Sequence, residues 1–262
     1  MTVSTDDGAP AHARGHALAD LGWEVRRTES GMVGSASLVP EMCVSGTAHL
    51  RTSILATWTD VVSGLLVVDA IRPRVPVTLE LDVHVYRPLP GSGLLLGHGT
   101  LVKSGRSVSV AQVDFTDEDG EPLAFGAASF MAAPDASMRI DFETSADRIM
   151  ERAGRLALPF AEHAGCERTG PGVAVLSRTE GVRNASNTIN GGLIALTAEE
   201  AALSLTPGTS LASLGLRYLQ PARIGAVVAT ARVRDGLGQI EVRDAGNEDR
   251  LCVMATSRVF GS

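Results

Sequence analysis

The chain has 262 residues, of which 44% are hydrophobic and 20% are charged, an ordinary globular composition. Its formal net charge of −7 argues against nucleic acid or an anionic membrane as a partner. No apolar run reaches the ~18 residues of a membrane span, and the three cysteines and six histidines are too scattered for a disulfide framework or a metal site. We therefore expect a reduced cytoplasmic protein of bacterial composition, rich in Ala, Gly, Val and Arg, with no metal and no cofactor.

The first part of the chain predicts a tail followed by a buried helix. Residues 1–17 are polar, lack the pattern of a signal peptide, and are expected to be flexible. Residues 18–38 predict a short helix or strand leading into a strand near Gly34–Leu38. Over Thr52–Ala70 the apolar residues surround most of a helical cylinder, which is typical of a buried helix, although Asp60 lies among them.

Four strand-like runs after this helix predict an antiparallel meander. They are rich in strand-forming residues and separated by turns with Gly, Pro and Asp. The runs are Val77–Tyr86, Gly93–Ser104, Ser107–Thr116 and Leu123–Met131. We therefore expect one structural unit over residues 18–136. Residues 137–171 break the pattern and predict a linker with a connecting helix over Ser145–Leu158.

Residues 172–262 repeat the order of the first unit. A strand at Val173–Leu176 precedes an Asn- and Gly-rich loop, and a second buried helix is expected over Leu193–Leu205. The remaining strands are expected at Ser210–Leu219, Ala226–Arg234, Gly238–Arg243 and Leu251–Phe260. Matching landmarks lie 139 residues apart from Asp60 to Glu199 and 133 apart from Pro88 to Pro221, which indicates an internal duplication.

Acidic residues within both buried helices are the first candidates for chemistry. An unpaired buried carboxylate is costly, or its pKa rises until it is neutral. In each copy an acid follows the small residues of the helix start by seven positions, from Ser53 to Asp60 and from Gly192 to Glu199. A core carboxylate with satisfied hydrogen bonds is the alternative interpretation.

A buried helix wrapped by an antiparallel sheet, with an acid inside the helix, resembles the hotdog fold. The motifs resemble the phenylacetyl-CoA and 4-hydroxybenzoyl-CoA branch of hotdog thioesterases, which carries N-x-x-G-x-x-H-G-G and then an acid seven residues later. The second copy has Asn184, Asn190, Gly191, Gly192 and Glu199 at these positions. The first copy has Asp60, Tyr86-Arg87-Pro88, Gly105-Arg106 and Asp119-Gly120 at the acid, the strand end and the later turns. The resemblance implies an α+β double hotdog, with two central buried helices each wrapped by an antiparallel β-sheet.

Neither copy carries the complete family set. The family His is replaced by Asn190 in the second copy and by Arg51 in the first. The family Gly-Gly is Thr52-Ser53 in the first copy, and the family Asn is Ser45 there. Because family sites lie between two paired units, the most complete combination is Asp60 of the first copy with the loop of the second.

The resemblance assigns roles to this combination. Asp60 would activate water or attack directly, Thr78 would orient the nucleophile, Gly191 would admit the acyl group and polarise its carbonyl with the helix N-terminus, and Asn184 would hold the water or the carboxylate. The expected substrate-binding residues are Asn190, Gly192 and Arg106, the last through coenzyme A phosphates. A second, more eroded candidate site combines Glu199, Arg51 and Thr52.

The implied function is hydrolysis of an acyl-CoA or acyl-carrier thioester at a site between the two units, by a chain that forms a homodimer. One alternative is a non-catalytic module that binds an acyl or CoA ligand at a decayed site. Another is an enoyl-thioester hydratase, although no His follows Asp60 within five residues, as that branch requires.

Overall fold

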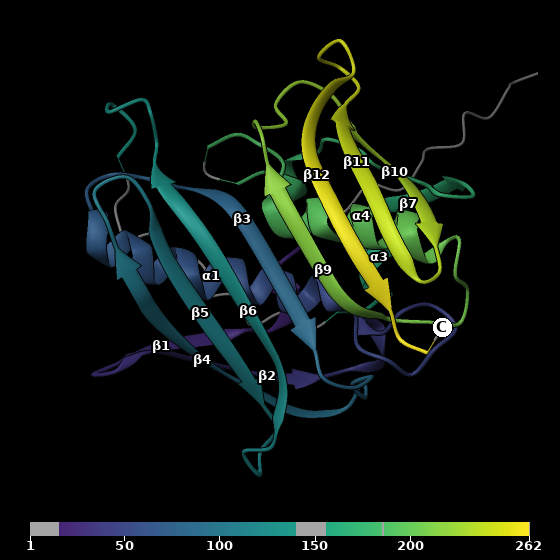
Figure 1. Ribbon diagram of the computed structural model, residues 1–262, viewed down its shortest axis with the longest axis horizontal. Coiled ribbons are helices and arrows are strands. Elements are labelled where there is room, and N and C mark those ends of the chain that lie inside the picture. Colours follow the sequence, from purple (N-terminus) through teal and green to yellow (C-terminus); the bar gives the residue numbers. More distant parts are fainter. Residues whose placement is uncertain (1–15, 140–155, 185, 262) are drawn as a thin grey trace, which may run out of the picture.

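In the part of the chain that the structure describes, one antiparallel sheet of twelve strands carries both units (Figure 1). The computed structural model describes residues 16–139, 156–184 and 186–261. The strand order is β1-β2-β4-β5-β6-β3-β9-β12-β11-β10-β8-β7. Read from its outer edge, the second half repeats the order of the first, with β7 in the place of β1 and β9 in the place of β3. This repetition confirms the predicted architecture of two wrapped helices with a joined sheet.

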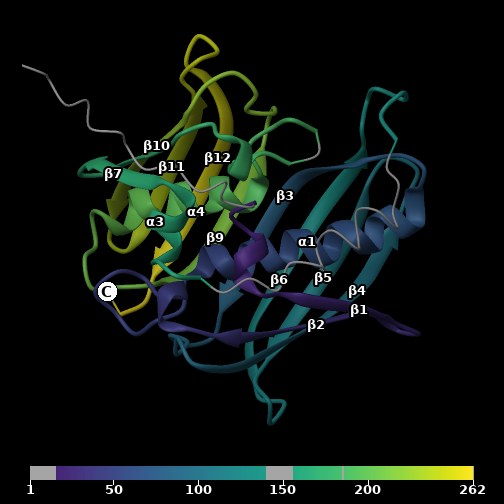
Figure 2. The same ribbon diagram turned by 180° about the vertical axis from the view of Figure 1, so that it is seen from behind.

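The first unit has one long helix. Its elements are η1 (Ala19–Leu21), β1 (Glu24–Thr28), β2 (Gly31–Leu38), η2 (Pro40–Met42), α1 (Thr52–Ile71), β3 (Pro76–Val85), β4 (Gly93–Ser104), β5 (Ser109–Thr116) and β6 (Pro122–Ala132). Helix α1 lies along one face of its strands (Figure 2). The bounds of α1, β3, β4, β5 and β6 agree with the predicted helix and strands to within two residues, and β2 begins three residues before the predicted Gly34.

The second unit follows the same plan. Its elements are α3 (Phe160–Ala164), β7 (Cys166–Gly170), β8 (Val173–Leu176), η3 (Glu180–Val182), α4 (Gly191–Leu203), β9 (Leu211–Tyr218), β10 (Val227–Arg234), β11 (Leu237–Asp244) and β12 (Arg250–Val259). Helix α4 begins two residues before the predicted Leu193, because Asn190 caps it, and ends two residues before the predicted Leu205.

The predicted boundaries differ from the structure in two places. Helix α3 and strand β7 lie inside the predicted linker, residues 137–171, so the second unit begins earlier than residue 172. Ala17, assigned to the tail, is buried, and its N–H donates to Gly181 O at 2.8 Å. Residues 1–15 and 140–155 lie outside the described residues, and the second of these ranges includes most of the connecting helix predicted over Ser145–Leu158.

The seam between the units is the pairing of β3 with β9. Asp82 lies opposite Gly215, and these two residues are separated by the same 133 positions as Pro88 and Pro221. Two equivalent residues that face each other mark an approximate two-fold axis. Arg217 Nη1 donates to Asp82 Oδ1 at 2.9 Å across this seam, and a side chain at position 215 would meet the same carboxylate.

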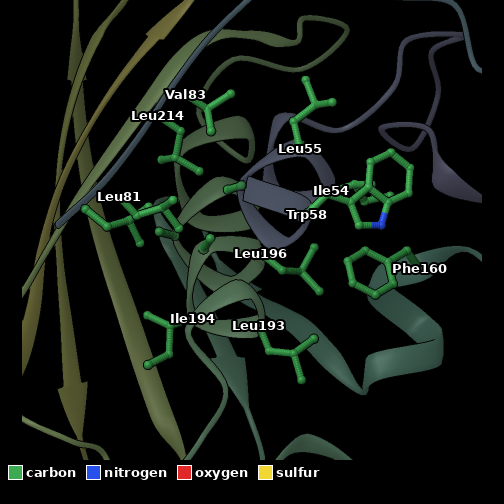
Figure 3. Close-up of a cluster of buried hydrophobic side chains, with 14 of the residues drawn as sticks. Ile54, Leu55, Trp58, Leu81, Val83, Phe160, Leu193, Ile194, Leu196 and Leu214 are labelled. Atoms are coloured by element: carbon green, nitrogen blue, oxygen red, sulfur yellow. The ribbon is translucent and has the colours of Figure 1, made fainter. Parts of the chain in front are cut away.

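Helices α1 and α4 pack together in the core (Figure 3). Apolar side chains from both helices, from β3 and β9 and from α3 surround the crossing; they include Ile54, Trp58, Leu81, Phe160, Leu193, Leu196 and Leu214. By length and composition alone α1 could cross a membrane, contrary to the expectation from apolar runs, but 61% of its apolar window is buried inside the protein. The apolar residues of α1 therefore pack in the protein core.

The helix crossing predicts a strict requirement for Gly192. A Cβ there would lie 2.9 Å from Thr57 Cβ and 3.0 Å from Thr57 Cα, and a backbone atom cannot swing away. We expect Gly192→Ala to lower the free energy of unfolding by about 1–3 kcal/mol, the usual cost of overpacking. The matched control is Gly64→Ala in α1, where a Cβ meets only Phe130 at 3.9 Å. Urea unfolding measures both, and equal stabilities would contradict the packing argument.

Candidate active site

The carboxylate of Asp60, from the first unit, faces the start of α4, from the second. A Cβ built on Gly191 would lie 3.3 Å from Asp60 Oδ2 and 3.1 Å from the hydroxyl oxygen of Tyr218. Asp60 is half-buried, so it is open to solvent on one side. Because Gly191 has no Cβ, no side chain stands between the acid and the start of α4.

Thr78 holds the other oxygen of this carboxylate. Its Oγ1 donates to Asp60 Oδ1 at 2.8 Å. The register of β3 against β6 shifts between Thr78 and Glu80, and such a bulge redirects the side chains beside it. With Oδ1 anchored, Oδ2 is the oxygen that faces Gly191.

The environment of Asp60 makes it a stronger base than an aspartate in water. Burial raises its pKa to about 6, and the hydrogen bond from Thr78 opposes part of this rise. The carboxylate is therefore charged at neutral pH, yet it accepts a proton more readily than an exposed aspartate.

The first turn of α4 offers a free amide beside Asp60. Asn190 Oδ1 accepts from the Gly192 N–H at 2.8 Å, so this amide is occupied. Within the described part of the chain, no group accepts a hydrogen bond from the Gly191 N–H. An unsatisfied amide at a helix N-terminus is suited to a negatively charged oxygen.

Tyr218 is the site residue that the sequence analysis missed. Its hydroxyl donates to Gly191 O at 3.0 Å. Burial, and then the charge of Asp60, raise its pKa well above the usual value. The available signal was the strand end before the proline, where Tyr218 stands three residues before Pro221 and the corresponding residue before Pro88 is Val85.

Asn184 and Arg106 are not brought against the Asp60 carboxylate. Asn184 Oδ1 accepts from the amides of Ser186 and Thr188 and so organises its own loop. Arg106 is exposed in the turn between β4 and β5. The register places this turn at the same end of the sheet as Thr78, two strands away.

The second candidate site is assembled but filled by its own acid. Glu199 Oε1 accepts from the amides of Thr52 and Ser53, at 2.8 and 3.2 Å, and the Ser53 hydroxyl donates to Oε2 at 2.6 Å. Arg51, fully buried, pairs with Glu199 at 3.4 Å and with Glu200. Burial raises the pKa of Glu199, although Arg51 and Ser53 oppose the rise. The amides of the α1 start are thus occupied by protein.

A cavity of ≈ 350 Å³ lies beside this filled site rather than beside Asp60. Its wall includes Ser45, Cys166, Arg168 and Glu200, and Arg168 Nε pairs with Glu200 at 2.5 Å. Both oxygens of Glu200 are therefore engaged by arginines. Among the described residues, no group of three or more His, Cys, Asp or Glu side chains gathers as metal ligands. The chemistry of the chain is thus best sought at Asp60 and Gly191.

Residues 49–124 match the family model of the thioesterase superfamily. This segment runs from the loop before α1 into β6 and contains Asp60 and Thr78. No curated protein matches the sequence.

Solved structures resemble both units together. A tesB protein of Mycobacterium avium subs paratuberculosis is 13% identical, with a TM-score of 0.60 over 94% of this chain and 98% of that chain. A 12:0-ACP thioesterase from Umbellularia californica is 9% identical, with a TM-score of 0.60 over 87% and 92%. A protein of unknown function with hot dog fold from Alicyclobacillus acidocaldarius is 14% identical, with a TM-score of 0.57 over 93% and 97%. The chain therefore has the double hotdog fold.

The raised pKa of Asp60 predicts that the stability of the folded state depends on pH. Between the ordinary value near 3.8 and about 6 the folded state holds a proton that the unfolded state has lost, so stability falls as pH rises through this window. We expect Asp60→Asn to gain stability over the wild type, from little difference below pH ~4 to at most ~3 kcal/mol above pH ~7. Denaturant titrations at both pH values measure this, and a pH-independent difference would contradict it.

Proposed function

We propose that this protein hydrolyses an acyl thioester at the site formed by Asp60, Thr78 and the start of α4. The observation that carries the proposal is the Asp60 carboxylate of the first unit lying against Gly191 of the second, whose N–H has no acceptor among the described residues. A base and an oxyanion donor are the two groups that acyl transfer to water requires. The match of residues 49–124 to the thioesterase superfamily supports the same reaction.

Each group has a defined task in the reaction. The thioester carbonyl oxygen accepts a hydrogen bond from the Gly191 N–H, and a water molecule lies between the carbonyl carbon and Asp60. Asp60 takes a proton from the water while the water oxygen bonds to the carbonyl carbon, and the carbonyl oxygen becomes negative. The C–S bond then breaks, the sulfur leaves with its electron pair, and the proton on Asp60 passes to it. Direct attack by Asp60, with a mixed anhydride as intermediate, uses the same geometry.

The substrate class we propose is an acyl-CoA or an acyl-carrier thioester. Both carry the acyl group on the thiol of a phosphopantetheine arm, so both present phosphate at the far end of that arm. Lys103 and Arg106 are exposed at the β4–β5 turn, at the end of the sheet where Thr78 holds Asp60. A solved structure with the same fold is named as an acyl-carrier thioesterase, which keeps carrier substrates in the panel to be tested. A homodimer remains a prediction.

The two alternatives make different predictions. A binding module without catalysis would retain acyl-CoA and release no thiol. A hydratase would need a second acid–base group beside Asp60, and the next five residues, VVSGL, supply none. A panel of acyl-CoA and acyl-carrier substrates with a thiol-detecting reagent separates the three functions.

Replacing each of the two helix acids in turn by its amide provides the sharpest test. We expect Asp60→Asn to lower kcat/KM by about 10²–10⁴, the usual contribution of a general base, while Glu199→Gln retains most activity per folded molecule. In the wild type, kcat/KM should rise with pH through about 6 and then level, because only the charged carboxylate accepts the proton. Steady-state kinetics over pH 4–9 measure this. Equal losses in both variants, with circular dichroism showing both folded, would refute the assignment.

A further inference from the structure

Tyr218 is the last residue of β9, and its hydroxyl lies between the sheet and the start of α4. It donates to Gly191 O, while Asn190 Oδ1 accepts from Gly192 N–H. The Gly191 carbonyl and the Gly192 amide belong to the same peptide plane. That plane is therefore held at both of its polar ends, once by a side chain of the sheet and once by the helix cap.

Such a double hold matters because two consecutive glycines begin the helix. Glycine has more backbone freedom than any other residue, so a Gly-Gly start can tilt its amides away from a fixed direction. The preceding peptide plane joins Asn190 O to the Gly191 N–H, and Asn190 O accepts from the amides of Leu193 and Ile194. Both planes that meet at the Gly191 Cα are thus held, the first by the helix and the second by Tyr218 and the Asn190 cap.

The hydroxyl of Tyr218 remains a donor over the working pH range. Burial, followed by the charge of Asp60, keeps the phenol protonated. The first unit has no equivalent of this tyrosine. The matching position, 133 residues earlier, is Val85, whose side chain has no hydrogen-bond donor. There the amides of Thr52 and Ser53 are held by Glu199 instead.

We propose that Tyr218 is a positioning residue that aims the Gly191 amide at the developing oxyanion. The inference rests on the proposed thioester hydrolysis and adds a residue to its machinery. Because the amide is used in the transition state more than in the ground state, its misalignment lowers kcat rather than raising KM.

The test compares the two tyrosines of the chain. Tyr218→Phe keeps the ring and removes only the hydroxyl, and Tyr86→Phe is the matched control because Tyr86 is 58% exposed and packs on Phe125. We expect Tyr218→Phe to lower kcat roughly tenfold with KM changed less than about twofold, and Tyr86→Phe to change neither. The wild type and both variants are assayed on the acyl-CoA that the wild type hydrolyses fastest.

Amide hydrogen exchange supplies a readout that does not depend on activity. Tyr218→Phe should speed exchange at Gly192, whose amide donates to Asn190 Oδ1, at least about threefold, with the remainder of α4 unchanged. A wild type without thioesterase activity would overturn the proposed function, yet exchange would still test the positioning of the amide. An active wild type with unchanged kcat in Tyr218→Phe, or unchanged exchange at Gly192, would overturn the role of Tyr218.

Discussion

The structure depends on the interaction between the amino end of each central helix and a carboxylate on the other helix. The two contacts, Asp60 with Gly191 and Glu199 with Thr52, lie at opposite ends of one antiparallel crossing. Halfway between them on each helix are alanines, Ala56 and Ala195, both fully buried. The amino end of a helix is partly positive, so a carboxylate is favourable at either end. Duplication of one unit with a two-fold axis through the crossing produces both contacts from a single design.

The two ends then differ by one methylene group and by the neighbours of each acid. Glu199 reaches the amides of α1 and is balanced by Arg51, so this end is closed and its hydrogen bonds are satisfied. Asp60 is shorter and is drawn toward Thr78, so it leaves the Gly191 amide free. A half-buried acid and an unoccupied amide both cost stability. Functional sites commonly lower the stability of a protein in this way. Here the satisfied hydrogen bonds of Glu199, at the other end of the crossing, offset that loss of stability.

Much of this arrangement could be predicted from the sequence because it follows from patterns that the fold preserves. Apolar residues around most of the helical cylinder identified α1 and α4, and the nearly constant interval between landmarks identified the duplication. The pairing of Asp60 with Gly191 followed from the resemblance to a family whose sites lie between two paired units. Strand β7 was missed because its residues, CERTG, are mostly polar and it lies at the sheet edge. The roles of Tyr218, Asn184 and Glu199 were not predictable, since each depends on which backbone group the side chain reaches, and a motif does not contain that distance.

The central claim is that only one of the two equivalent helix ends receives substrate, and ligand stoichiometry tests it most directly. Calorimetric titration of the folded Asp60→Asn variant with an intact acyl-CoA measures binding without turnover. One ligand per chain is the predicted result, with binding lost in a second variant that adds Gly191→Val and retained in one that adds Thr52→Val. Two ligands per chain, or one ligand that depends on Thr52 and not on Gly191, would contradict the account.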